Sequence, residues 1–279
     1  MPRMIAKNAA TRRCLCKKGA RRFFSLLAVT ACLVSGSSRW ELCRGQDRVL
    51  PTTEEVAEPN ADESLRRSSQ KKWAEEIQRL RRLDEVETYP NDAVLFLGSS
   101  SIRLWETIAK DLAPFVPIRR GFGGAQSVDL AVHGPELIRS HRYAAIVLFV
   151  ANDVSGEEGR ADYQPEQVID WLKEVCRVSQ EHQPSAPLLL VEVTPTQLRR
   201  HVWPEQRRLN EKLREWTFSE ENLYFLPTAE YFLDAKDEVR RELFGPDELH
   251  LNREGYRLWG DLIRRRLEEL LARSPVPST

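Results

Sequence analysis

Apolar residues recur along this chain in short runs that are separated by longer amphipathic stretches. Five runs have the length of a strand, at residues 93–97, 115–118, 144–150, 188–193 and 223–226. The later stretches carry apolar residues at helical spacing, over residues 101–112, 126–139, 165–182, 204–218 and 253–272. Near-continuous apolar strands that alternate with helices are typical of a parallel sheet covered on both faces. The pattern therefore predicts an α/β domain with a five-stranded parallel sheet.

An amphipathic helix and a polar stretch precede this alternation. Residues 71–87 carry apolar side chains at helical spacing with charged residues between them, which predicts a helix docked on the domain. Residues 45–69 are rich in Glu, Pro, Asn, Asp, Ser and Thr and lack apolar periodicity, so we interpret them as a flexible linker. The folded domain is therefore expected over residues 70–274.

The first 44 residues differ from the rest of the chain in charge. They contain ten Lys or Arg and one acid, so the remainder carries a net charge of −9. Basic residues up to Arg22 are followed by the apolar run "FFSLLAVTACLVSG", Phe23 to Gly36, which is shorter than the about 20 residues of a spanning helix. This order is typical of a secretory signal. We therefore expect residues 1–44 to be a signal peptide or membrane-targeting segment, and the protein to be exported to the periplasm or the cell exterior.

Two alternatives concern the same segment. Left uncleaved, it would remain as a membrane anchor. The second alternative is lipidation, because the stretch "VTAC", which ends at Cys32, resembles a bacterial lipobox, in which this cysteine would carry the lipid. Contact with a membrane is expected only through this segment. The acidic remainder argues against a nucleic-acid partner, and only Cys176 lies well inside the domain, which predicts neither a disulfide framework nor a zinc cluster.

Small and polar residues gather where the predicted strands end. The first strand is followed by "GSSS", residues 98–101, the second by "RRGFGGAQS", residues 119–127, and the third by "VANDVSG", residues 150–156. The last helix is preceded by "GPDELHLNREGY", residues 245–256. Because the carboxyl ends of parallel strands meet at one edge of a sheet, these segments are expected to converge there.

Ser100 and His250 are the candidates for nucleophilic catalysis. A serine is a weak nucleophile until a base takes its proton. Asp247 precedes His250 by three residues, a spacing that lets the carboxylate bond Nδ1 of the imidazole and leaves Nε2 free to act as that base. The alternative is a plain helix N-terminal turn capped by Asn252. Of the remaining histidines, three are expected at outer positions in contact with solvent, namely His133, His141 and His182. The fourth, His201, is expected beside a cleft.

Three groups could stabilise a developing oxyanion. The backbone N–H of Ser100 lies at the predicted start of a helix. The pair Gly123-Gly124 allows close approach of the backbone because no side chain intervenes. Asn152 supplies a side-chain amide after the third strand. A tight turn and an Asx-turn are the alternative interpretations of the last two features.

The four motifs together resemble the SGNH hydrolase superfamily, whose best-known members are the GDSL esterases and lipases. "FLGSSSIRLW" resembles the nucleophile block and "RGFGGAQS" the glycine block. "VAND" resembles the G-x-N-D block and "DELH" the D-x-x-H block. The matches run in order over roughly residues 93–272. The resemblance implies a flavodoxin-like, three-layer α/β/α fold.

The resemblance also implies a set of site residues. Ser100, Asp247 and His250 take the places of the catalytic triad. Ser100, Gly124 and Asn152 take the places of the oxyanion hole. The implied reaction is ester hydrolysis. The expected export and the lack of a lid-sized apolar insertion favour short-chain acyl esters of small molecules or acetylated carbohydrates as substrates. It requires no metal and no organic cofactor.

Two departures from the family pattern keep other functions open. Ser99 replaces the usual aspartate and is expected to cap the next helix, and Val150-Ala151 replaces the usual glycine-containing approach to Asn152. One alternative is an acyltransferase that acts on glycans with the same triad. Another is a carbohydrate-binding relative without turnover. A nucleotide-binding role is disfavoured because "GFGGAQS" lacks both the P-loop lysine and the G-x-G-x-x-G spacing.

Overall fold

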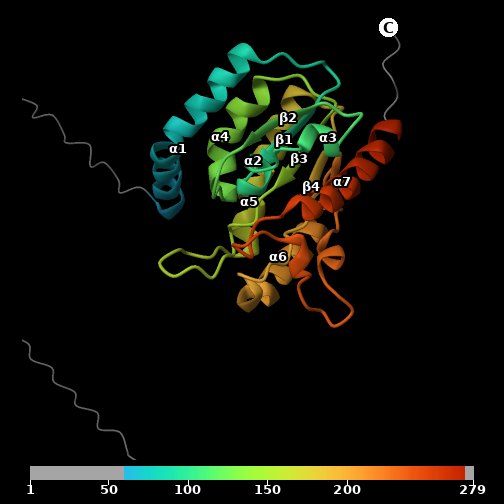
Figure 1. Ribbon diagram of the computed structural model, residues 1–279. Coiled ribbons are helices and arrows are strands. Elements are labelled where there is room, and N and C mark those ends of the chain that lie inside the picture. Colours follow the sequence, from blue (N-terminus) through green and yellow to red (C-terminus); the bar gives the residue numbers. More distant parts are fainter. Residues whose placement is uncertain (1–59, 274–279) are drawn as a thin grey trace, which may run out of the picture. The chain divides into compact units, whose positions relative to one another are not determined.

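The computed structural model describes residues 60–273, and a parallel five-stranded sheet lies at the centre of this part of the chain (Figure 1). The strand order is β2-β1-β3-β4-β5, which is the flavodoxin-like order. The five predicted strands are all present. They are β1 (Val94–Gly98), β2 (Pro117–Gly121), β3 (Ala145–Phe149), β4 (Leu188–Val191) and β5 (Leu223–Leu226).

Seven α-helices occur within residues 60–273. They are α1 (Ala61–Val86), α2 (Ser100–Arg103), α3 (Ile108–Asp111), α4 (Ser127–Arg139), α5 (Pro165–His182), α6 (Trp203–Thr217) and α7 (Arg253–Arg273). The helix predicted over residues 101–112 is therefore two single turns. Between them Trp105 is fully buried and stacks on Tyr256 of α7, with ring centroids 5.5 Å apart. The chain breaks the helix there to place this indole in the core.

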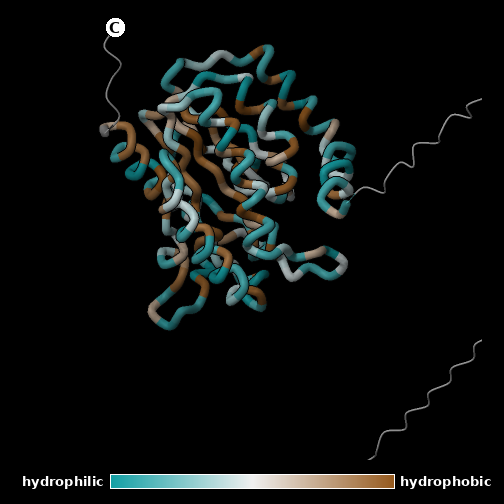
Figure 2. Tube along the Cα trace, turned by 180° about the vertical axis from the view of Figure 1, so that it is seen from behind, coloured by the Kyte–Doolittle hydropathy of each residue, from teal (hydrophilic) through white to brown (hydrophobic). Residues whose placement is uncertain are grey.

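Two apolar clusters cover the two faces of the sheet, because alternate side chains of a strand point to opposite sides. Leu95 and Leu97 pack in a cluster with residues of α1, α4, α5 and α6. Val94 and Phe96 pack in a second cluster with residues of α2, α3 and α7. The apolar runs of the strands lie between these helical layers (Figure 2). The predicted three-layer α/β/α fold is confirmed.

The first helix begins earlier than the sequence pattern indicates. α1 starts at Ala61, and the side chain of Asn60 caps it by accepting the N–H of Glu63 at 2.8 Å. The indole of Trp171 on α5 donates to Asp62 at 2.7 Å, so this first turn is bound to the domain. The linker expected through residue 69 is therefore wrong from residue 61 onward. Tertiary contacts order a stretch whose composition is typical of a linker.

The predicted signal segment and the rest of the linker lie outside the described residues. Within residues 60–273, no helix combines the length and the apolar character needed to cross a membrane. Cys176 is buried as expected, and burial raises the pKa of its thiol to about 12.

The histidines at the outer ends of the helices are less exposed than expected. His133 is buried and its Nε2 lies 3.3 Å from the carbonyl oxygen of Ser69. His141 is also buried, with Nε2 3.0 Å from Oδ1 of Asp84. Ser69 and Asp84 both belong to α1. The expectation of solvent contact is wrong for these two histidines because α1 covers them.

Candidate active site

Ser100 is the first residue of α2 and follows the carboxyl end of β1. The turn that carries it needs Gly98, because a Cβ there would lie 2.0 Å from the carbonyl oxygen of Phe149 on β3. The backbone N–H of Ser99 donates to the same carbonyl at 3.1 Å. The close passage of β1 and β3 therefore fixes the position of the serine at the sheet edge.

Hydrogen bonds connect Ser100, His250 and Asp247 in one chain. Nε2 of His250 lies 2.8 Å from Oγ of Ser100, and Nδ1 lies 2.6 Å from Oδ2 of Asp247. The other carboxylate oxygen, Oδ1, accepts the backbone N–H groups of Leu249 and His250 at 3.1 and 2.9 Å. This geometry leaves the imidazole able to exchange a proton with the serine hydroxyl.

The turn that holds Asp247 and His250 lies close to solvent. The side chain of Asp247 is 52% exposed and that of His250 is 24% exposed. Burial would raise the pKa of Asp247, but the hydrogen bonds from the His250 side chain and from two backbone N–H groups outweigh it and hold the pKa below its usual value. The carboxylate therefore stays ionised beside the imidazole at neutral pH.

The turn is also the start of α7, so the alternative interpretation of the motif holds at the same time. Oδ1 of Asn252 accepts the N–H groups of Glu254 and Gly255 at 3.0 and 3.1 Å, which caps the helix. The hydroxyl of Tyr256, one turn into α7, donates to the carbonyl of Ser101 at 3.0 Å. The cap and this bond attach the histidine turn to the serine turn.

The three predicted oxyanion donors lie at the same edge. Ser100 and Asn152 line one cavity, and Gly124 follows β2, the neighbour of β1. Within the described part of the chain, the backbone N–H groups of Ser100 and Gly124 donate no hydrogen bond. Gly124 has a φ of +77°, a conformation that favours glycine. Nδ2 of Asn152 donates one of its two hydrogens to the carbonyl of Ala125 at 2.9 Å, which leaves the second available.

Hydrogen bonds between buried residues join the glycine loop to the end of β3. Nε2 of Gln126 donates to the carbonyl of Asn152 at 3.1 Å. The backbone N–H and the hydroxyl of Ser127 both donate to the Asp153 carboxylate, at 2.8 and 2.7 Å. Burial raises the pKa of Asp153 to about 6, although the bonds from Ser127 act against this. Two of the predicted donors, Gly124 and Asn152, therefore belong to one cross-linked scaffold.

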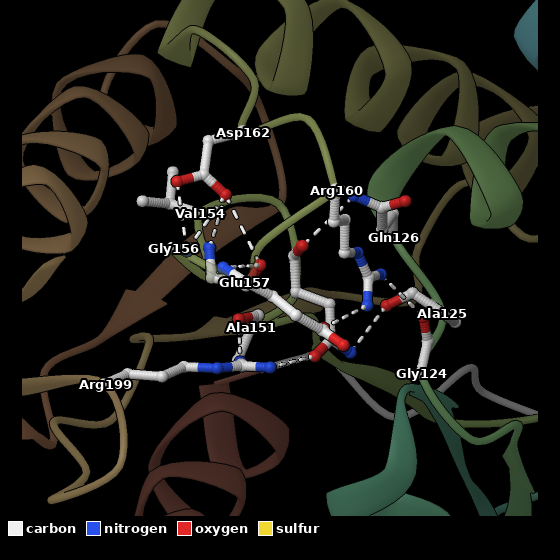
Figure 3. Close-up of polar contacts among 12 residues, drawn as sticks. Gly124, Ala125, Gln126, Ala151, Val154, Gly156, Glu157, Arg160, Asp162 and Arg199 are labelled. Carbon is white, nitrogen blue, oxygen red and sulfur yellow. Dashed lines mark hydrogen bonds and ion pairs between the residues drawn. The ribbon is translucent and has the colours of Figure 1, made fainter.

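Arg199 is a site residue that the sequence did not reveal. It lies in the loop after β4, and the residue is only 8% exposed. Its guanidinium donates to the carbonyl of Ala151 at 2.6 Å (Figure 3). It also donates to Oδ1 of Asn152 at 2.8 Å. The adjacent Arg200 instead donates to the carbonyl of Asp237 and is more exposed. Nothing in "LRR", residues 198–200, distinguishes the two arginines before folding.

A small cavity opens beside the serine. Ser100, Asn152 and His250 line it together with Phe149 and Trp259, and its volume is about 20 Å³. That is about the room needed for one or two water molecules. The cavity can hold a small group next to the serine hydroxyl.

Three other expectations differ from the structure. The side chain of Ser99 makes no cap hydrogen bond, although the residue occupies the N-cap position, and the residue is buried and lines the cavity. His182, expected in solvent, is half-buried, and its Nε2 lies 2.8 Å from the carbonyl of His141. His201 does not line the cavity. Its Nε2 lies 3.4 Å from the carbonyl of Gly156, on the outer side of the loop after β3.

Comparisons with known proteins agree with this fold. The sequence model of the family described as GDSL-like Lipase/Acylhydrolase matches residues 96–258. A GDSL-like lipase from Bacteroides thetaiotaomicron is similar in structure, with a TM-score of 0.58 and 17% identity, over 69% of this chain and 97% of that chain. No curated protein matches the sequence.

Two further solved structures share the fold. The lipase/acylhydrolase from Enterococcus faecalis is 18% identical, with a TM-score of 0.50, over 67% of this chain and all of that chain. A carbohydrate esterase family 3 protein from Talaromyces cellulolyticus is 13% identical, with a TM-score of 0.50, over 65% of this chain and 98% of that chain. At these identities the likeness concerns the fold.

Proposed function

We propose that this chain, which belongs to the GDSL-like lipase/acylhydrolase family, is a serine esterase that hydrolyses short-chain acyl esters. The observation that carries the proposal is the continuous hydrogen-bonded chain from Asp247 through His250 to Ser100. The carboxylate lies against Nδ1 of the imidazole, and Nε2 lies within reach of the serine hydroxyl, as their roles in a triad require. In this proposal the backbone N–H groups of Ser100 and Gly124 and the side-chain amide of Asn152 form the oxyanion hole.

The proposed reaction has two steps. Oγ of Ser100 attacks the ester carbonyl while Nε2 of His250 takes the hydroxyl proton, and that proton then goes to the leaving alcohol. Asp247 orients the imidazole and stabilises its charged form. The N–H groups of Ser100 and Gly124 and the amide of Asn152 donate to the oxyanion. Water, deprotonated by His250, then releases the acid and restores the serine.

The size of the cavity supports a short acyl group. The cavity of about 20 Å³ beside Ser100 has room for an acetyl methyl group. Acetylated carbohydrates are the proposed natural class. Two features support that class, namely the expected export and the similar fold of a carbohydrate esterase family 3 protein.

The Ser100→Ala variant tests the proposal. We expect kcat for an aryl acetate to fall by about 10⁶-fold, as when the nucleophile of a triad is removed, with no change in melting temperature. Ser140→Ala, an exposed serine at the end of α4, is the control and should keep full activity. An organophosphonate should label the native enzyme at Ser100 and leave the variant unlabelled. Undiminished hydrolysis by Ser100→Ala would exclude the proposed nucleophile.

The substrate class is tested separately. Aryl esters of rising acyl length should show kcat/KM falling steeply beyond acetate, and acetylated xylan should release acetate. If a sugar acceptor diverts the acyl group from water, the chain is an acyltransferase with the same triad. Absence of both labelling and turnover would favour the carbohydrate-binding alternative.

Export remains a proposal that depends on residues 1–44. Fractionation of cells that produce the full chain should find the protein outside the cytoplasm. A Cys32→Ser variant that moves from the membrane fraction to the soluble exported fraction would indicate lipidation at that cysteine. Retention of both forms in the cytoplasm would refute the signal segment.

A further inference from the structure

The geometry points to Arg199 as a positioning residue that holds the Asn152 amide with its remaining N–H toward the reacting carbonyl. The inference concerns the same site and rests on the proposed esterase function. Arg199 lines the cavity beside Ser100 but has no part in the triad, and its guanidinium donates to Asn152 and to the adjacent backbone carbonyl. Its role is therefore separable from that of Ser100.

The charge of Arg199 is the first reason to assign it a function. The residue is 8% exposed, and the two acceptors of its guanidinium are both neutral amide oxygens. Among the residues that the structure describes, it forms no ion pair with a carboxylate. Burial and the nearby Arg160 lower the pKa of Arg199, while the carboxylates of Glu157 and Asp162, which form no ion pair with it, act against this. A buried cation whose direct acceptors are all neutral costs stability, so folding alone does not favour an arginine here.

The hydrogen bonds around Asn152 are the second reason. A primary amide has one oxygen that accepts and one nitrogen that donates, and the two ends have nearly the same shape. Arg199 offers only donors, so it must face Oδ1, while the carbonyl of Ala125 offers only an acceptor and must face Nδ2. Rotation of the amide by half a turn would break both bonds. The pair of contacts therefore fixes which end of Asn152 faces the substrate.

The guanidinium also changes the strength of the donor. A cation that donates to Oδ1 draws electron density from the amide and makes the remaining N–H of Asn152 a stronger donor. This effect grows as negative charge develops on the substrate oxygen, so it favours the transition state over the ground state. Loss of Arg199 should accordingly lower kcat more than it raises KM.

The planar fork of arginine suits this position. One arm bonds the backbone at Ala151 (Figure 3), and the other bonds the side chain of the next residue, Asn152. On the other side of the site, Arg160 donates to the carbonyl of Gly124 at 3.0 Å. A lysine at position 199 would bring the charge but not the fixed pair of donors. The Arg199→Lys variant therefore separates charge from geometry.

The experiment compares Arg199→Gln and Arg199→Lys with a matched control. Arg200→Gln removes the same charge one residue later, where the guanidinium bonds a carbonyl on the outer surface. For an aryl acetate, we expect Arg199→Gln to lower kcat about tenfold to hundredfold, less than the about 10²–10³-fold loss of a whole oxyanion donor. KM should change less than about twofold. Arg199→Lys should recover part of kcat, and Arg200→Gln should match the native enzyme.

A double-mutant cycle with Asn152→Ala gives the decisive comparison. If Arg199 acts through the amide, Arg199→Gln should lower kcat less than about twofold in the Asn152→Ala background. Equal losses in both backgrounds, or a loss of kcat that follows a lower melting temperature, would overturn the inference.

The same cation could instead bind an anionic acyl group of the substrate. In that case Arg199→Gln would raise KM for an aryl succinate and leave kcat for the acetate unchanged, and this result would also overturn the inference. The Ser100→Ala variant distinguishes a failure of the proposed esterase function from a failure of the role inferred for Arg199. If it stays active, the proposed function fails, whereas an unaltered Arg199→Gln beside an inactive Ser100→Ala refutes only the role of Arg199.

Discussion

The candidate active site has two halves that differ in how they are held. The triad half consists of Ser100, Asp247 and His250, and two of its three residues lie in one exposed turn. The oxyanion half consists of Gly124, Asn152 and Arg199, which come from three segments of the chain. The side chains of Asn152 and Arg199 are buried. Local bonds within four residues orient the histidine, whereas bonds across the chain orient the asparagine.

The difference indicates where each half is vulnerable. A change in the triad half should remove chemistry and leave the fold intact, because the turn is close to solvent. A change in the oxyanion half should affect both the chemistry and the stability of the fold. Its polar groups are buried, and removing one of them leaves its hydrogen-bond partner unsatisfied. Measuring kcat and stability together therefore tests the comparison.

The largest effect in this series is expected for Asp247→Asn. The amide keeps the shape of the carboxylate but favours the wrong imidazole tautomer, so kcat should fall about 10⁴-fold, as in a triad of this kind. The free energy of unfolding should change by less than about 1 kcal/mol because the side chain is half exposed. Kinetics and urea denaturation of the same preparation check both values. A large loss of stability would contradict the contrast between the halves.

Asn152→Ala is expected to have the next largest effect on catalysis. Loss of one oxyanion donor lowers kcat by about 10²–10³-fold. The variant also leaves Arg199 and the carbonyl of Ala125 without their partner, which should lower the free energy of unfolding by about 1–3 kcal/mol. Thus the variant with the smaller kinetic defect should be the less stable one. Stability equal to that of Asp247→Asn would contradict the contrast.

Gly124→Ala should have a smaller effect. The nearest atom to an added Cβ is 3.9 Å away, on the ring of Trp73, so the methyl group fits, but a φ of +77° is unfavourable for alanine by about 1–2 kcal/mol. A shift of the N–H away from the oxyanion should lower kcat about tenfold. Gly159→Ala is the matched control, with a φ of +79° and open space around the Cβ. It should lose similar stability and keep full kcat.

The smallest effect on catalysis is expected from the titration of Asp153. Its pKa is about 6 in the folded protein and near 3.8 in the unfolded chain, so the folded state holds the proton more tightly. The stability contributed by this group is full below about pH 4 and is lost as the pH rises through about 6. The free energy of unfolding should fall over this range by on the order of 1–3 kcal/mol.

Asp153→Asn is the variant that isolates this titration. It should lack this part of the pH dependence, and its kcat at pH 7 should stay within about threefold of native. Chemical denaturation of both proteins at pH 4, 5, 6 and 7 gives the measurement. Parallel curves for the two proteins would show that Asp153 does not titrate in this range.

The sequence predicted the fold, and the structure confirms it. The strands β1, β3 and β4 are fully buried apolar runs and lie at the predicted places. The prediction for β2 differs most, since Arg119 and Arg120 obscure its second half. The buried Arg120 joins β2 to Asp84 of α1, a contact that no local pattern predicts. The early start of α1 likewise depends on contacts with distant segments, which no local pattern predicts.

Some features of this protein follow from nearest neighbours in the chain alone. These are the alternation of strands and helices and the three-residue spacing from Asp247 to His250. Their geometry follows from backbone sterics and local hydrogen bonds, which neighbouring residues specify.

The tertiary structure alone decided which polar groups meet. It placed His250 within 2.8 Å of Ser100, 150 residues away. It also selected Arg199 rather than Arg200 to lie against Asn152. Such partners are set by burial, because a polar group removed from water must find whichever partner the packing of distant segments brings near.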